Sequence, residues 1–101
     1  MPWAIEYYVT AGGRCPIREF VDGLLKARQK YIFITSLLTE YGVLVKEPYV
    51  KQLTGRKKLF EIRIKDRTGI SRILYFTHTG RKFILLHGFT KKNGQNPSEG
   101  D

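Results

Sequence analysis

Three consecutive strand-like runs constrain this chain more than any other feature of its sequence. Residues 58–65 alternate apolar and charged side chains, so that Phe60, Ile62 and Ile64 share one side of an extended segment. Residues 70–78 are rich in β-branched and aromatic side chains, and residues 83–89 are strongly apolar. The links at 66–69 and 79–80 have the length and composition of hairpin turns. The segment therefore predicts an antiparallel meander of three strands.

One further strand and two helices are predicted ahead of the meander. Period-two alternation predicts a strand over residues 3–10. Pro16 fits the first position of a helix, and Gly42 is placed as the C-terminal stop of a second one. The polar run 26–30 separates the two helices, and residues 43–56 look irregular. The predicted apolar stripes consist of Ile17, Phe20, Val21, Leu24 and Leu25, and of Ile34, Leu37, Leu38 and Tyr41.

These elements predict one small α+β domain over residues 1–92, with the order β-α-α-β-β-β. An antiparallel sheet would carry a two-helix hairpin packed on one face, although one long bent helix is an alternative. The 101 residues suit a single domain with one modest core. Residues 93–101 have no apolar periodicity and are expected to form a flexible C-terminal tail.

Cysteine and histidine content narrows the kind of site that the chain can build. The single cysteine, Cys15, excludes an internal disulfide and fits a reducing cytoplasm. The two histidines, His78 and His87, give no zinc-ligand spacing, so no metal site is expected. No apolar run approaches the roughly 18 residues of a membrane span, and the first residues do not read as a secretory signal. We therefore expect a cytoplasmic protein without a membrane partner.

Positive charge is concentrated in one segment of the chain. Residues 1–50 carry six basic and five acidic side chains, whereas residues 51–92 carry twelve basic and two acidic ones. Such clustering is the electrostatic footprint of a face that binds a polyanion. A solubilising surface is the alternative. The asymmetry favours a nucleic-acid partner.

The meander also carries three motifs that resemble a known family. Its first strand contains LFEIRI (59–64), which resembles the L-W/F-E-L-R strand of the HigB-type, phage Gp49-like branch of the RelE/ParE superfamily. The second contains SRILYF (71–76), similar to the R-V-L-Y-F strand of that branch. The third ends in LLHGFTKK (85–92), similar to its L-L-H-G-F-x-K-K strand. Relatives continue with a T-P element and a C-terminal helix, which residues 93–101 do not match.

The resemblance implies a microbial RNase fold and the toxin role of a type II toxin–antitoxin system. It implies a ribosome-dependent mRNA endonuclease that inhibits translation, with the RNA 2′-OH as nucleophile and with neither metal nor cofactor. It also implies partners: the ribosome, mRNA and a cognate antitoxin, usually of the helix-turn-helix HigA type, in a toxin–antitoxin hetero-oligomer.

Three cations of the first two meander strands are candidate catalytic residues. Arg72 lies where the family places an arginine that binds the transition state, and a guanidinium can grip phosphate with two hydrogen bonds. An ion pair with Asp66 or Glu61 is the alternative for Arg72. Arg63 and Lys65 share the polar side of their strand and resemble the paired strand lysines of RelE; a solvated sheet face is the alternative.

The third strand and its exit supply the remaining candidates. His87 has the titration range of a general acid or base, although a lone histidine in an apolar strand is more often a hydrogen-bonded core residue. Lys91 and Lys92 are expected to follow the strand, face the cationic side and contact phosphate. Phe89 could stack on a base or pack in the core. A docking patch for ribosomal RNA is predicted from Lys51, Arg56, Lys57 and Lys58.

Two other functions remain open at this point. A ParE-like inhibitor of DNA gyrase would have a similar fold and a similar antitoxin partner, but it would act by binding and would not cleave RNA. A non-catalytic relative that binds RNA or protein is the other alternative. The L-L-H-G-F-x-K-K segment favours the endonuclease.

Overall fold

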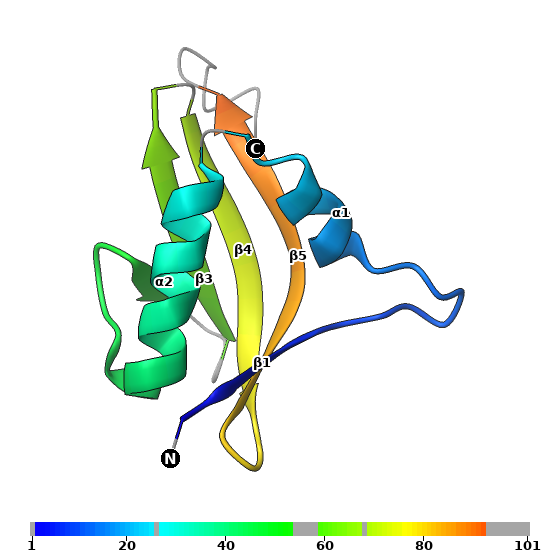
Figure 1. Ribbon diagram of the computed structural model, residues 1–101, viewed down its shortest axis with the longest axis vertical. Coiled ribbons are helices and arrows are strands. Elements are labelled where there is room, and N and C mark those ends of the chain that lie inside the picture. Colours follow the sequence, from blue (N-terminus) through cyan, green and yellow to red (C-terminus); the bar gives the residue numbers. More distant parts are fainter. Residues whose placement is uncertain (1, 26, 54–58, 68, 93–101) are drawn as a thin grey trace.

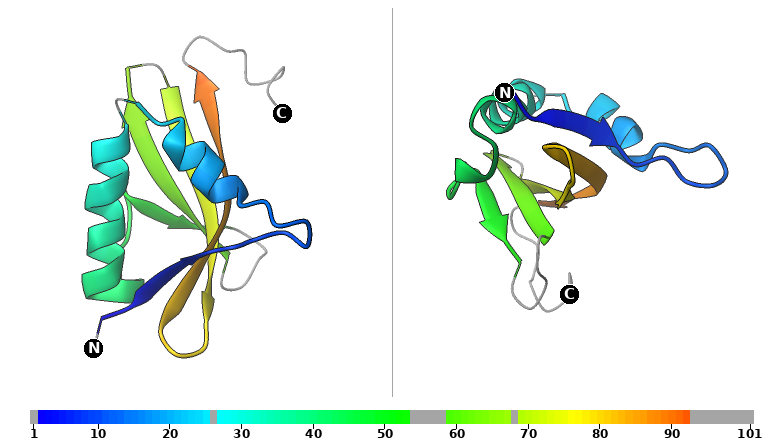
Figure 2. Two further views of the ribbon diagram at one scale, coloured as in Figure 1. Left: turned by 45° about the vertical axis from the view of Figure 1, so that its right-hand side comes forward. Right: turned by 90° about the horizontal axis from the view of Figure 1, so that it is seen from below.

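The computed structural model describes residues 2–25, 27–53, 59–67 and 69–92, with the side chain of Lys92 excepted. Within these residues, five strands form one sheet in the order β1-β5-β4-β3-β2, and two helices lie on the same face of it (Figures 1 and 2). The elements are β1 (Ala4–Tyr7), α1 (Pro16–Asp22), α2 (Arg28–Tyr41), the 3-10 helix η1 (Gly42–Leu44), β2 (Val50–Gln52), β3 (Leu59–Asp66), β4 (Gly69–His78) and β5 (Lys82–Lys92).

The predicted antiparallel meander is confirmed. Strand β4 pairs with β3 on one side and with β5 on the other, both in antiparallel orientation. At the first turn, the backbone N–H of Gly69 donates to the Asp66 carboxylate at 3.1 Å. At the second, Gly80 and Arg81 both adopt positive φ angles of 80° and 59°, which suits a tight connection between twisted strands. Tight turns thus set the register of the three strands.

Two features of the sheet differ from the prediction. Strand β1 runs parallel to β5, with Ile5 opposite Phe83, so the sheet is mixed rather than antiparallel. A short strand, β2, lies inside the segment that we predicted to be irregular, and it pairs with residues 60–62 of β3. Both strands occupy edges of the sheet, where pairing depends on a distant segment that local sequence patterns do not reveal.

Both helices form where the apolar spacing predicts them, but their ends differ. Helix α1 begins at Pro16 and stops at Asp22, so Leu25 lies beyond it and is 87% exposed instead of buried. Helix α2 stops at Gly42, whose φ is 60° and whose added Cβ would lie 2.2 Å from the Trp3 indole nitrogen. Tyr41 is also exposed, contrary to the prediction. Neither described helix is long and apolar enough to cross a membrane.

The core lies between the helices and one face of the sheet. Helix α1 packs on β5, and α2 lies over β3 (Figure 1). The buried side chains include Ile17, Val21, Tyr31, Ile34 and Leu38 from the helices, and Ile62, Ile64, Ile73, Tyr75, Phe83 and Leu85 from the sheet. Alternation along the strands then sends their intervening residues to the opposite face.

A β-bulge in β5 interrupts this alternation. Tyr75 of β4 lies opposite Leu85, and the preceding residue Leu74 lies opposite His87. Leu86 is therefore an extra residue without a partner on β4. After Leu86, each side chain therefore points to the face of the sheet opposite to the one that it would have in an uninterrupted strand.

The reversal decides which side chains of β5 reach the uncovered face. Gly88 now faces the helices, since an added Cβ there would lie 2.5 Å from the Phe20 ring. His87, Phe89 and Lys91 consequently face away from the helices. Without the bulge they would share the helix-facing side with Leu85, because residues two apart in a strand lie on one face.

Candidate nucleic-acid interface

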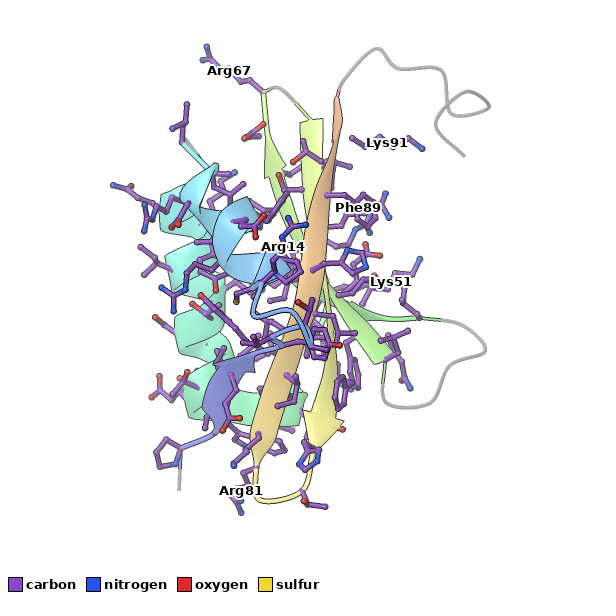
Figure 3. All side chains as sticks on the ribbon, turned by 90° about the vertical axis from the view of Figure 1, so that its right-hand side faces the viewer. Arg14, Lys51, Arg67, Arg81, Phe89 and Lys91 are labelled. Carbon is purple, nitrogen blue, oxygen red and sulfur yellow. The ribbon has the colours of Figure 1, made fainter. Side chains whose placement is uncertain are left out.

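One face of the sheet is left uncovered by the helices, and the predicted site residues whose side chains the structure describes lie there. We call it the open face. Figure 3 shows Lys51, Phe89 and Lys91 projecting on the side of the sheet opposite the helices. The open face includes the polar and aromatic residues Lys51, Glu61, Arg63, Lys65, Arg72, His87, Phe89 and Lys91.

Strand register arranges these side chains in rows across the sheet. The central row joins Arg63 of β3, Arg72 of β4 and Phe89 of β5 as direct cross-strand partners. Directly opposed side chains lie about 4.5–5.5 Å apart at Cβ, so the two arginines and the ring are neighbours. The flanking rows are Lys65, Ile70 and Lys91 on one side, and Lys51, Glu61, Leu74 and His87 on the other.

A buried carboxylate holds the two arginines of the central row. Glu61 is only 4% exposed. Its Oε1 accepts a hydrogen bond from Nη1 of Arg72 at 3.1 Å and lies 3.6 Å from Nε of Arg63. A buried carboxylate requires such partners, because charge removed from water without compensation is costly. One anion thus positions two cations, and the cluster retains a positive excess.

Arg72 therefore forms one of the alternative ion pairs that its sequence position suggested, with Glu61. This hydrogen bond uses only one of the five N–H donors that the planar guanidinium group carries. Its Nε is buried and lacks a hydrogen-bond partner among the described residues. An orphaned buried donor costs about 1–3 kcal/mol. The side chain is held in place by Glu61 while retaining donor capacity for an anion.

His87 and Phe89 lie on the surface, which excludes the core-packing alternative for both residues, while their catalytic and base-stacking roles stay predictions. His87 is exposed rather than packed in the core. Phe89 is 44% exposed, and its ring centroid lies 6.4 Å from that of His87. Both rings stand beside the arginine cluster, where they are accessible to a ligand on the open face.

The lysines at the end of β5 lie inside the strand, not beyond it as predicted. Strand β5 continues to Lys92, whose backbone pairs with Gly69, and Lys91 pairs with Ile70. Lys91 belongs to the open face, whereas the side chain of Lys92 lies outside the described part of the chain. The same holds for three of the four predicted docking residues, Arg56, Lys57 and Lys58.

The tyrosines with displaced pKa values lie on the other side of the sheet. Burial raises the pKa of Tyr31, whose hydroxyl also shares a 2.5 Å hydrogen bond with Tyr7. Burial likewise raises the pKa of Tyr75, which is 2% exposed. Both phenols stay protonated in the core. In the described part of the chain, no group of three His, Cys, Asp or Glu side chains gathers to hold a metal ion.

Sequence reasoning treated Glu61 only as a possible partner for Arg72 and missed its central place. A signal was present, because Glu61 and Arg63 are two apart in a strand and so share a face. What the sequence could not show is that the Glu61 side chain is buried under both arginines.

Comparisons with known proteins agree with the fold and the motifs. The family model described as phage-derived protein Gp49-like matches residues 19–99. No curated protein matches the chain. A solved structure, the crystal structure of the archaeal RelE–RelB complex from Pyrococcus horikoshii OT3, includes a chain that is similar in fold. The TM-score is 0.59 at 18% identity, over 95% of this chain and 100% of that one.

The family match spans well over half of the chain, and the structural similarity extends over nearly all of it. At this level of identity the structural comparison establishes the fold, and the family model establishes the relationship. The chain therefore belongs to the phage-derived Gp49-like family that the strand motifs predicted, and its fold is similar to that of a chain of the RelE–RelB complex.

Proposed function

We propose that this protein is the toxin of a type II toxin–antitoxin system and that it cleaves mRNA on the ribosome. The observation that carries the proposal is the central row of the open face, in which Arg63, Arg72 and Phe89 adjoin one another across three strands. Two guanidinium groups beside an exposed ring suit the phosphate and base of a single-stranded RNA.

The proposed chemistry uses the RNA 2′-OH as nucleophile on the adjacent phosphate. Arg72, held by Glu61, would bind the phosphate and stabilise the extra negative charge of the transition state. Arg63 and Lys65 would add positive charge from β3, and Lys91 from β5. His87 is the candidate to move the proton of the 2′-OH or of the leaving 5′-oxygen, because histidine is the side chain most often used for general acid–base catalysis.

An antitoxin is the proposed second partner. The structurally similar chain comes from a RelE–RelB complex, and the family resemblance favours a helix-turn-helix protein of the HigA type. We propose that such a partner forms a hetero-oligomer with this chain in the cytoplasm. Co-expression with the product of a neighbouring gene, followed by co-purification, tests this.

The decisive experiment is translation of a defined message by purified ribosomes, with primer extension to map breaks. We expect new cuts in phase with codons when the protein is added. Arg72→Ala should lower the cutting rate on the order of 10²–10³-fold, as for loss of one preorganised donor to a transition state. Arg72→Lys keeps the charge beside Glu61 but loses the planar fork, so it should also be impaired.

Arg18→Ala serves as the matched control, since Arg18 lies on α1 over the Tyr7 ring, away from the open face. Its cutting should be unchanged, and thermal melts establish that all variants are folded. Normal cutting by Arg72→Ala would refute the site. An absence of codon-linked cuts, combined with inhibition of DNA gyrase, would overturn the endonuclease in favour of a ParE-like activity.

A further inference from the structure

A cleft of about 520 Å³ lies at the outer edge of β3, within the roughly 300–1,000 Å³ range of small-molecule sites. It opens because β2 pairs only as far as Ile62. The Tyr49 carbonyl still accepts from the Arg63 N–H at 2.9 Å. The residues that matter for its chemistry are Lys30, Phe33, Glu47, Tyr49, Arg63 and Lys65.

Two aromatic rings form one corner of the cleft. Phe33 of α2 and Tyr49 meet edge to face, with ring centroids 5.7 Å apart and an interplanar angle of 73°. Both stay accessible, with 51% of Phe33 and 37% of Tyr49 exposed. Exposed aromatic rings set at an angle suit a flat, unsaturated ligand that stacks on one ring and contacts the other.

Three cations and one carboxylate surround this corner. Lys30 donates a hydrogen bond to the backbone carbonyl of Lys65, which ties α2 to the edge of β3. Arg63 and Lys65 line the cleft and also belong to the open face. Glu47 is the carboxylate of the lining. The site thus suits a ligand that combines negative charge with a flat ring.

We propose that the cleft binds one unstacked nucleotide of the RNA strand held on the open face. The base would lie against Phe33 and Tyr49, and its phosphate would lie on Arg63 and Lys65. Glu47 would accept a hydrogen bond from a base N–H. The inference rests on the proposed RNA-binding function and extends it, because the strand would pass around the edge of β3. An acidic peptide could meet the same cations, but it would leave the aromatic corner without a flat partner.

The test is a nuclear magnetic resonance titration of the full chain with the four nucleoside 3′-monophosphates and with ribose 5-phosphate. Nucleotides should shift the ring signals of Phe33 and Tyr49 together with the side-chain signals of Arg63 and Lys65. Ribose 5-phosphate, which lacks a base, should shift only the two cations. Ring signals that do not move with any nucleotide, or that move equally with ribose 5-phosphate, overturn the inference.

A pair of adjacent variants sharpens the result. Phe33→Ala should weaken nucleotide binding roughly tenfold, in the range of losses seen when a stacking side chain is removed. Ile32→Ala is the matched control, since Ile32 is the preceding residue of α2, is 54% exposed and does not line the cleft. Equal effects of the two substitutions would overturn the assignment. So would displacement of bound nucleotide by an acidic peptide that shifts the rings more strongly than any nucleotide does.

The outcome is independent of the ribosome assay. If codon-linked cutting depends on Arg72 but the rings of the cleft do not respond, the proposed function stands and this inference fails. If the rings respond but no cutting occurs, the cleft binds nucleotides and the endonuclease proposal fails.

Discussion

The two faces of one sheet have opposite characters although the same strands build them. On the helix-covered face, Ile62, Ile73 and Leu85 are each 0% exposed. On the open face, the side chains of Arg63 and Arg72 remain 33% and 28% exposed around one buried carboxylate. Successive residues of a strand point to opposite sides, so one segment can supply both a core and a charged surface. The comparison predicts that stability and the proposed activity are separable residue by residue.

The most severe test of this separation substitutes one phenylalanine on each face. Phe83 is 1% exposed and stacks on Trp3, with ring centroids 4.6 Å apart. Phe83→Ala should lower the free energy of unfolding by about 3–5 kcal/mol, because a large buried ring leaves a cavity. Phe89→Ala should change it by about 0.5 kcal/mol or less, as for a surface residue. Chemical denaturation measures both, and similar losses would contradict the assignment of the two faces.

A smaller effect on the free energy of unfolding is expected at the bulge, where the side chains of β5 switch from one face of the sheet to the other. Gly88→Ala places a methyl group against the Phe20 ring and should cost about 1–3 kcal/mol through overpacking. His87→Ala, one residue earlier on the open face, is the matched control and should melt like the parent protein. Combining Gly88→Ala with Phe20→Leu should recover part of the loss. If the glycine substitution is neutral, residue 88 does not face the helices.

The smallest effect concerns the salt dependence of RNA binding. Lys51 belongs to the open face, next to Glu61 across the β2–β3 pair. Lys51→Ala should reduce the slope of log affinity against log salt by about 0.7, the value for one phosphate contact to a single strand. Arg18→Ala, on the helix side, should leave the slope unchanged. Fluorescence anisotropy with a labelled oligoribonucleotide at several salt concentrations makes the measurement. Equal slopes for all three proteins would remove Lys51 from the interface.

Most elements of the fold could be predicted from local patterns. The alternation of Phe60, Ile62 and Ile64 with charged residues marks β3 because a half-buried strand requires that period. Pro16 and Gly42 mark helix limits because their backbone preferences act locally. Local patterns did not predict the pairing of the two edge strands. The parallel direction of β1 and the existence of β2 depend on partners about 80 and 10 residues away in sequence, respectively.

The candidate site likewise contains residues that local patterns predict and residues that depend on pairing between strands. Arg63 and Lys65 were predictable, because their facing follows from simple alternation within β3. For His87, Phe89 and Lys91, alternation alone predicts the helix-covered side that Leu85 occupies. The extra residue Leu86 reverses it. The strand-interior Gly88 is compatible with a bulge or a close approach. The sequence does not place the extra residue, because the bulge arises from the register between β4 and β5.

What the sequence by itself determined is the set of local periods: strands, helices, turns and the segment that carries the positive charge. Only the tertiary structure decided which cations meet. Glu61 draws Arg72 and Arg63 together because a carboxylate excluded from water requires cationic partners within reach. The bulge then brings Phe89 and His87 to that cluster. Both effects depend on cross-strand neighbours, and neighbours across strands are set by packing of the whole domain rather than by the order of residues along one strand.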